Sequence, residues 1–249
     1  MRQIVYSILA VFVLIGCSNK SKLVVATSAN MQFAVEEIQD KFEKEEGIAI
    51  DLIIGSSGKL SAQIEQGAPY DVFISANTKY PQYLFDKNLT EDEPKVYAHG
   101  RLVLWTCKNF IPSLDSLTSG AIEKIAIANP KHAPYGEAAV SVLKNEGIYD
   151  AVLPKLVYAE SISQCNHLIT TKAVDVGFTS YSTISSEKMK NTGNWIAVDN
   201  TDHDPIEQAA VIIKNSDKKE AARKFYEFLF SDPAIDILQN YGYLIPGHE

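Results

Sequence analysis

Histidine, cysteine and basic residues are all scarce in this chain, and each shortage excludes a class of protein. The 249 residues include 5 His and 3 Cys, and no two His residues have the i, i+4 spacing of a helical zinc site, so no metal centre is predicted. Lys and Arg number 23 against 31 Asp and Glu, which gives a formal net charge of −8. A nucleic-acid-binding surface needs clustered cations to neutralise phosphates. We therefore expect no nucleic-acid partner.

Low-complexity linkers and internal repeats of fixed period are also absent from the sequence. With 46% hydrophobic and 22% charged residues, the chain has the composition of a globular protein rather than a disordered or multi-spanning one. Its length is sufficient for a substantial core and for two lobes.

A nearly continuous apolar run over residues 4–15 opens the chain after a single positive charge. The run is too short to cross a bilayer comfortably as a helix, and its plan is typical of an export signal. The sequence Leu-Ile-Gly-Cys at 14–17 resembles the bacterial lipobox, in which the Cys is acylated and the peptide before it is removed. We predict a signal peptide over 1–16, lipidation at Cys17 and a polar tether over 17–22.

Lipidation at Cys17 implies an exported cell-envelope lipoprotein, on the periplasmic side or the outer face of a membrane. The alternative is a buried N-terminal helix, which the polar Ser-Asn-Lys-Ser-Lys after Cys17 disfavours. Cys107 and Cys165 then remain, and an exported compartment permits a disulfide between them. Their spacing does not decide between a disulfide and two buried thiols, so both stay open.

Short apolar segments of β type alternate with amphipathic helical segments, which is typical of an α/β protein with largely parallel sheets. In the first unit, a strand at 23–27 is followed by apolar residues at helical spacing from Met31 to Phe42, and Gly47 is the expected helix stop. Further strands are predicted at 48–54, 71–76, 101–106, 125–128, 156–158, 174–179, 195–198 and 208–213, and two helices at 218–230 and 233–241.

Four loops that lead from a predicted strand into a helix are rich in hydroxyl-bearing or small residues. They lie at 27–30, 55–58, 130–136 and 159–162. Ligands of open α/β sheets gather at the carboxyl ends of the strands, where helix N-termini present unpaired N–H donors. The serines can donate further hydrogen bonds to an anion, or they can act only as helix caps.

Five segments in the same order resemble the molybdate-binding proteins of ABC importers. They lie at 25–29, 55–60, 66–76, 129–136 and 240–243, and the Gly-Ala-Pro-Tyr-Asp-Val-Phe-Ile-Ser-Ala block within the third is distinctive. The resemblance runs from about residue 23 to residue 246.

The resemblance implies a two-lobed periplasmic-binding-protein fold of type II, in which each lobe is a mostly parallel sheet flanked by helices. Lobe I is expected over 23–98 and 205–249, and lobe II over 99–204. The implied function is high-affinity binding of molybdate, and of tungstate, between the lobes, with delivery to an ABC permease and its ATPase. The protein would be a monomeric carrier without a cofactor and not an enzyme.

The resemblance also implies the residues that hold the ligand. Ser28 and Ser57 would each give a hydroxyl and a backbone N–H from lobe I, and Tyr135 and Ile162 would give backbone N–H groups from lobe II. Some family members add a Tyr hydroxyl, and an ungapped alignment puts Ser180 at that position.

Tyr181 follows Ser180 directly, so either residue, or neither, would contact the ligand. Molybdate and tungstate are unprotonated dianions that only accept hydrogen bonds, so a site made of donors alone suits them. Sulfate is also an acceptor only, but it is smaller, and it stays open as an alternative ligand. Phosphate carries a proton and would favour an added carboxylate acceptor.

Rival functions have weaker support in the sequence. Ser56 and Lys59 have the Ser-x-x-Lys spacing of penicillin-interacting enzymes, but the accompanying Ser-Asp-Asn and Lys-Thr-Gly elements are missing. Asp71 lacks a partner carboxylate and is expected to be structural. A ferric site would need clustered Tyr, His and carboxylate residues, yet the four loops contain only Tyr135. A surface interaction module would need no cleft at all.

Overall fold

The structure is a computed structural model in which residues 22–247 are described. The predicted signal peptide, the lipidation site Cys17 and the tether up to Ser21 lie outside the described residues. Within the described part, no helix is both long enough and apolar enough to cross a membrane.

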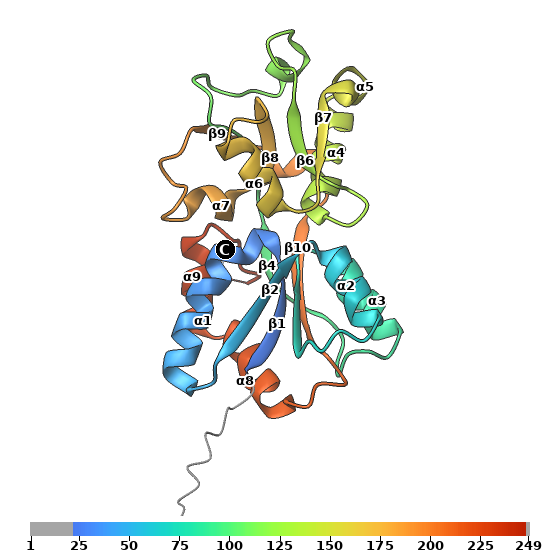
Figure 1. Cartoon of the computed structure of the whole chain (residues 1–249), viewed down its shortest axis with the longest axis vertical. Coiled ribbons are helices and arrows are strands. Elements are labelled where there is room, and N and C mark those ends of the chain that lie inside the picture. The colour runs from blue at the N-terminus through green and yellow to red at the C-terminus, as the bar shows by residue number, and fades with distance from the viewer. Residues whose placement is uncertain (1–21, 248–249) are drawn as a thin grey trace, which may run out of the picture.

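Two five-stranded sheets form two lobes, which Figure 1 shows one above the other. The lobe I sheet has the order β2 (Ile50–Gly55), β1 (Leu23–Ser28), β3 (Val72–Ser75), β10 (Ile206–Ile212) and β4 (Lys95–Gly100). The lobe II sheet has the order β7 (Leu156–Ala159), β6 (Ile125–Ala128), β8 (Val176–Ser180), β5 (Leu102–Thr106) and β9 (Asn194–Ala197). The expectation of a two-lobed α/β fold is confirmed.

The prediction that each sheet is mostly parallel is confirmed in strand direction, because four of the five strands in each sheet run the same way and one, β10 in lobe I and β5 in lobe II, runs antiparallel to both of its neighbours. The reason for the exception is that these two strands carry the chain between the lobes. Strands β5 and β10 enter a lobe from the cleft, so they start at the cleft edge. The strands that deliver loops to the cleft end there and therefore run the opposite way.

The crossings between the lobes are short. Strand β4 ends at Gly100 and β5 begins at Leu102, and the chain returns to the first sheet at Ile206. The predicted boundaries near His99 and Pro205 lie beside these strand ends, although β4 itself was not predicted as a strand. His99 and Gly100, which we expected to open lobe II, pair with β10 in the lobe I sheet.

Helices cover both faces of each sheet (Figure 1). In lobe I they are α1 (Gln32–Glu46), α2 (Ser57–Glu65), α3 (Lys79–Asp86), α8 (Lys219–Leu229) and α9 (Asp232–Asn240). In lobe II they are α4 (Pro134–Asn145), α5 (Tyr149–Val152), α6 (Ile162–Thr170) and α7 (Tyr181–Ser185). Helix α1 buries Ala34, Ile38 and Phe42 on one face, and it ends at Gly47, whose φ of 65° is left-handed.

Strand register brings the predicted ligand loops to one edge of each sheet. Ser28 at the end of β1 is paired with Gly55 at the end of β2, and Ala128 at the end of β6 is paired with Ala159 at the end of β7. The helices that follow therefore begin side by side, so their N-termini converge from both lobes on the space between the sheets.

Candidate functional site

A small cavity lies between the lobes, at the ends of these strands. None of the described residues that line it carries a charged side chain. The lining from lobe I is Ser28, Ala29, Asn30, Ser56, Ser57 and Ala76, and the lining from lobe II is Ala133, Pro134, Tyr135 and Ile162.

Two serine hydroxyls at this cavity are buried without a partner. Ser28 is 2% exposed and Ser56 is 4% exposed, and neither Oγ atom has a hydrogen-bond partner among the described residues. Both residues stand at helix N-cap positions, yet neither side chain makes a capping hydrogen bond. An unsatisfied buried hydroxyl costs free energy, so a group in the cavity that accepted hydrogen bonds from these two would remove that cost.

The hydroxyl of Ser57 differs, because its Oγ accepts a hydrogen bond of 3.0 Å from the backbone N–H of Ala76. A hydroxyl has one proton and two acceptor lone pairs, so this bond orients the oxygen and leaves the proton to donate. The arrangement makes Ser57 a third hydroxyl donor at the cavity.

Backbone N–H groups supply the remaining donors. Ser57 and Ile162 are the first residues of α2 and α6, and Tyr135 is the second residue of α4. N–H groups in the first turn of a helix have no acceptor within the helix, and they lie at the positive end of the helix dipole. Because Pro134 has no N–H, Tyr135 provides the first donor of α4.

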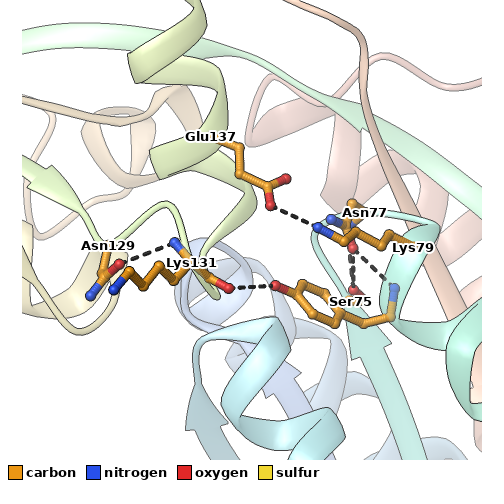
Figure 2. Close-up of polar contacts among 7 residues, drawn as sticks. Ser75, Asn77, Lys79, Asn129, Lys131 and Glu137 are labelled. Atoms are coloured by element: carbon orange, nitrogen blue, oxygen red, sulfur yellow. Dashed lines mark hydrogen bonds and ion pairs between the residues drawn. The ribbon is translucent and has the colours of Figure 1, made fainter.

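Contacts across the mouth of the cavity hold the lobes together. Lys59 pairs with Glu160 at 2.8 Å and Lys79 pairs with Glu137 at 3.1 Å, the second pair being drawn in Figure 2. Lys59, through a hydrogen bond and its charge, lowers the pKa of Glu160. The carboxylates of Glu137 and Glu160 are thus engaged with lysines of the other lobe.

Backbone contact between the lobes depends on Gly58. Its N–H donates to the carbonyl oxygen of His132 at 2.9 Å. A Cβ atom at Gly58 would lie 2.7 Å from His132 Cβ and 2.8 Å from the Tyr80 ring, which is closer than such atoms approach. A side chain at position 58 would therefore require the loop of His132 or the ring of Tyr80 to move.

Of the six predicted ligand residues, the structure brings Ser28, Ser57, Tyr135 and Ile162 to the cavity and leaves two elsewhere. Ser180 and Tyr181 are not among its described lining residues.

The Ser180 hydroxyl bonds to Thr183 Oγ1 at 2.9 Å and accepts from Ser182 Oγ at 3.0 Å. The Tyr181 ring lies 4.4 Å from the guanidinium carbon of Arg101, at the crossing into lobe II. Both side chains are therefore committed to contacts outside the cavity.

Sequence reasoning missed Ser56 and Asn30 as lining residues. Ser56 lies in the predicted ligand loop at 55–58, but only its neighbour Ser57 was named as a ligand residue; Lys59, which completes the Ser-x-x-Lys spacing, pairs with Glu160. Asn30 belongs to a predicted ligand loop, but nothing in the sequence shows which side chains of that loop face the cavity.

Other polar groups singled out from the sequence have structural roles. The Asp71 carboxylate accepts hydrogen bonds from the Val24 N–H at 2.7 Å, Ser216 Oγ at 2.7 Å and Lys218 Nζ at 3.0 Å. Within residues 22–247, Cys107 and Cys165 are both free. The same range contains no group of three or more His, Cys, Asp or Glu side chains placed to hold a metal ion.

Comparison with known proteins agrees with this fold and site. The chain is 33% identical over 225 residues to the molybdate-binding protein ModA of Rhodobacter capsulatus, covering 90% of this chain and 88% of that protein. It is 31% identical over 248 residues to a Bacillus subtilis protein provisionally named ABC transporter substrate-binding lipoprotein YvgL, covering 94% and 95%.

The solved structure of the Azotobacter vinelandii periplasmic molybdate-binding protein superposes with a TM-score of 0.86 at 33% identity, covering 90% of this chain and 100% of that one. The family model for bacterial extracellular solute-binding proteins matches residues 23–244. Because that match spans both lobes and the strands that join them, the chain belongs to the family of bacterial extracellular solute-binding proteins.

Proposed function

We propose that the protein is a non-enzymatic carrier that binds molybdate, and tungstate, in the interlobe cavity and delivers it to an ABC permease with its ATPase. The observation that carries the proposal is the pair of buried hydroxyls, on Ser28 and Ser56, that lack a partner at a cavity whose described lining has no charged side chain. The names of the relatives from Rhodobacter capsulatus and Azotobacter vinelandii support the same ligand.

The donors favour an unprotonated dianion. The polar groups that we expect to contact the ligand are hydroxyls and backbone N–H groups, and each can donate to an oxygen that only accepts. Asn30 also lines the cavity, but its Nδ2 already donates to Gln208 and Tyr243. A protonated oxyanion such as phosphate would leave its own proton without a carboxylate acceptor, because the described lining of the cavity contains no Asp or Glu. Sulfate meets the same chemical requirement and differs from molybdate in size.

Titration calorimetry with molybdate, tungstate, sulfate and phosphate tests this proposal on the purified protein. We expect tight binding of both metal oxyanions, weaker binding of sulfate and no heat with phosphate. Bound ligand should also raise the free energy of unfolding by about 2.7 kcal/mol at a hundredfold excess over Kd. Absence of heat with molybdate and tungstate would overturn the ligand assignment.

We also propose that a lipid on Cys17 anchors the protein to a membrane, with the soluble body working as a monomer. The lipobox resemblance at residues 14–17 supports the anchor, as does the name of the Bacillus subtilis relative. Mass spectrometry of the membrane-extracted protein should find acylated Cys17 as the first residue, and Cys17→Ala should release the protein from the membrane fraction. An unmodified N-terminus would contradict the anchor and leave the binding proposal intact.

A further inference from the structure

Gln208, on the strand β10 that returns the chain to lobe I, lies at the centre of a buried polar network. Its side chain is 0% exposed. Its Oε1 accepts hydrogen bonds from Asn30 Nδ2 at 2.9 Å and from the Tyr97 hydroxyl at 3.0 Å. Its Nε2 donates to the Tyr135 hydroxyl at 3.2 Å. One amide therefore joins two groups of lobe I to one group of lobe II.

Tyr135 connects this network directly to the cavity. Its backbone lies at the cavity in the first turn of α4, while its side chain crosses to the strands that link the lobes. The hydroxyl occupies the space left by the missing side chain of Gly100, where a Cβ atom would lie 2.1 Å from it. The position of the Tyr135 ring thus fixes where its backbone N–H stands.

Asn30 makes the same connection from lobe I. It lines the cavity, and its Nδ2 donates both to Gln208 and to the Tyr243 hydroxyl at 2.9 Å. Its carbonyl oxygen accepts from Ser182 Oγ of lobe II at 2.8 Å. Hydrogen bonds therefore link the cavity-lining loops of the two lobes, and the Gln208 side chain bonds to a residue from each loop, Asn30 of lobe I and Tyr135 of lobe II.

Size is the property by which a donor-only cavity can separate molybdate from sulfate, since both ions carry the same charge and neither has a proton. The distance between opposed donors depends on how far the lobes close. Polar groups buried in a fully bonded network tolerate little displacement, because each broken bond leaves an unsatisfied partner.

We propose that Gln208 is a positioning residue that sets the closed distance between the lobes through Tyr135, and thereby selects the larger metal oxyanions over sulfate. This inference rests on the proposed function. Without the link, the lobes close to a less defined distance, so molybdate loses well-placed donors while the smaller sulfate loses less.

Tyr135→Phe tests the link, because it removes the hydroxyl and keeps both the ring and the backbone N–H. Molybdate and sulfate affinities would be measured by calorimetry, with sulfate by displacement. We expect the ratio of the sulfate Kd to the molybdate Kd to fall about tenfold, the equivalent of one buried hydrogen bond. Gln208→Met should lower the ratio at least as far, because it breaks the same link and also the bonds from Asn30 and Tyr97. The double variant should fall no further than Gln208→Met, because the link to Tyr135 is already broken.

Tyr97→Phe is the matched control, since its hydroxyl bonds to the same Oε1 of Gln208 but both residues belong to the lobe I sheet. We expect it to leave the ratio unchanged. Equal loss of affinity for both anions in Tyr135→Phe, or an equal change of the ratio in Tyr97→Phe, would overturn the positioning role while the proposed function stood. If the unaltered protein bound neither anion, the proposed function would fail first.

Discussion

The two lobes offer the ligand different kinds of donor. Lobe I presents hydroxyls, on Ser28, Ser56 and Ser57, in addition to backbone N–H groups. Lobe II lines the cavity with Ala133, Pro134, Tyr135 and Ile162, so its donors are backbone N–H groups. The lobe I contribution can be removed by deleting single oxygen atoms, whereas the lobe II contribution depends on the conformation of its loops.

This difference explains which features of lobe II matter. Its loop from β6 to α4 passes so close to the sheet that a Cβ atom on Gly136 would lie 1.9 Å from the carbonyl oxygen of Ala128. The glycine lets α4 start against the end of β6, and that placement brings the first turn of α4, with Tyr135, to the cavity. Under the proposed function, Tyr135 and Ile162 would contact the ligand through backbone N–H groups, so their side chains would matter only by positioning that backbone.

Gly136→Ala should produce the largest loss of ligand binding. The new methyl group forces the first turn of α4 away from β6, which displaces the Tyr135 N–H and the contacts that close the lobes. We expect molybdate affinity to fall by at least about a hundredfold in calorimetry, since a charge-assisted hydrogen bond and lobe closure are both impaired.

Gly120→Ala is the control for this change, because Gly120 also lies in lobe II and a Cβ atom there would have nothing within 4 Å. We expect it to bind molybdate normally. Circular dichroism must show that both variants are folded. Unimpaired binding by folded Gly136→Ala would show that the loop conformation is not what lobe II contributes.

Ser28→Ala and Ser57→Ala should each weaken molybdate binding by about tenfold, because each removes one hydrogen bond to a charged ligand. Ile162→Val changes a side chain of the opposite lobe but keeps its N–H, so calorimetry should find it close to the unaltered protein. If all three substitutions weakened molybdate binding equally, the proposed difference between hydroxyl donors in lobe I and backbone donors in lobe II would be wrong.

The ligand-free stability of Ser28→Ala separates ligand binding from capping. Loss of a capping serine costs roughly 1 kcal/mol of unfolding free energy. Ser28 makes no capping hydrogen bond, so urea unfolding without ligand should show no such loss. A loss of that size would assign the hydroxyl to helix capping instead.

A second contrast concerns stability at the far end of lobe II, where Asp175 precedes β8. Burial is the largest influence on its pKa and raises it, but hydrogen bonds from Lys108 and from the N–H groups of Lys124 and Glu123 outweigh burial, so the pKa is lowered. A carboxyl whose pKa is lower in the folded state stabilises the fold above its unfolded pKa of about 3.9. That stabilisation is lost as the pH falls through the folded value.

Asp175→Asn should therefore lower the unfolding free energy by about 1–3 kcal/mol at pH 7, as expected for hydrogen bonds to a charged group. Urea unfolding at neutral and acidic pH checks this, and the gap between variant and unaltered protein should shrink as the pH falls through the lowered pKa. Molybdate affinity at pH 7 should stay unchanged, because Asp175 lies outside the cavity lining. A gap independent of pH would assign the loss to packing.

Much of the fold could be predicted because most strands are short apolar runs. The predicted strand at 125–128 matches β6 residue for residue, the one at 23–27 is one residue shorter than β1, and the one at 71–76 is one residue longer than β3 at each end. Strand β4 was missed because its sequence, Lys-Val-Tyr-Ala-His-Gly, mixes polar and apolar residues without a run. The antiparallel course of β5 and β10 depends on tertiary connections that periodicity does not report.

The site was predictable as a set of loops and less so as a set of atoms. The predicted strand ends indicated where helix N-termini would meet. The four residues expected there lie at the cavity, namely Ser28, Ser57, Tyr135 and Ile162. The sequence could not show that the Ser56 hydroxyl lacks a hydrogen-bond partner whereas the Ser57 hydroxyl has one, because the conformation of the folded backbone determines which hydroxyl is near a partner. Gln208 gave one signal in retrospect, because an amide in an otherwise apolar strand needs buried partners.

The ion pairs at the cleft mouth should matter least to binding. Lys59 and Glu160 bridge the lobes, but their side chains are 43% and 73% exposed, and exposed pairs contribute little. We expect Glu160→Gln to weaken molybdate binding by no more than about threefold at low salt. The difference should vanish near 1 M salt, where screening acts over about 3 Å. Glu187→Gln is the matched control, because Glu187 pairs with Lys190 within lobe II, and it should have no effect at either salt concentration. A large, salt-independent loss in Glu160→Gln would instead place that carboxylate among the groups that shape the cavity.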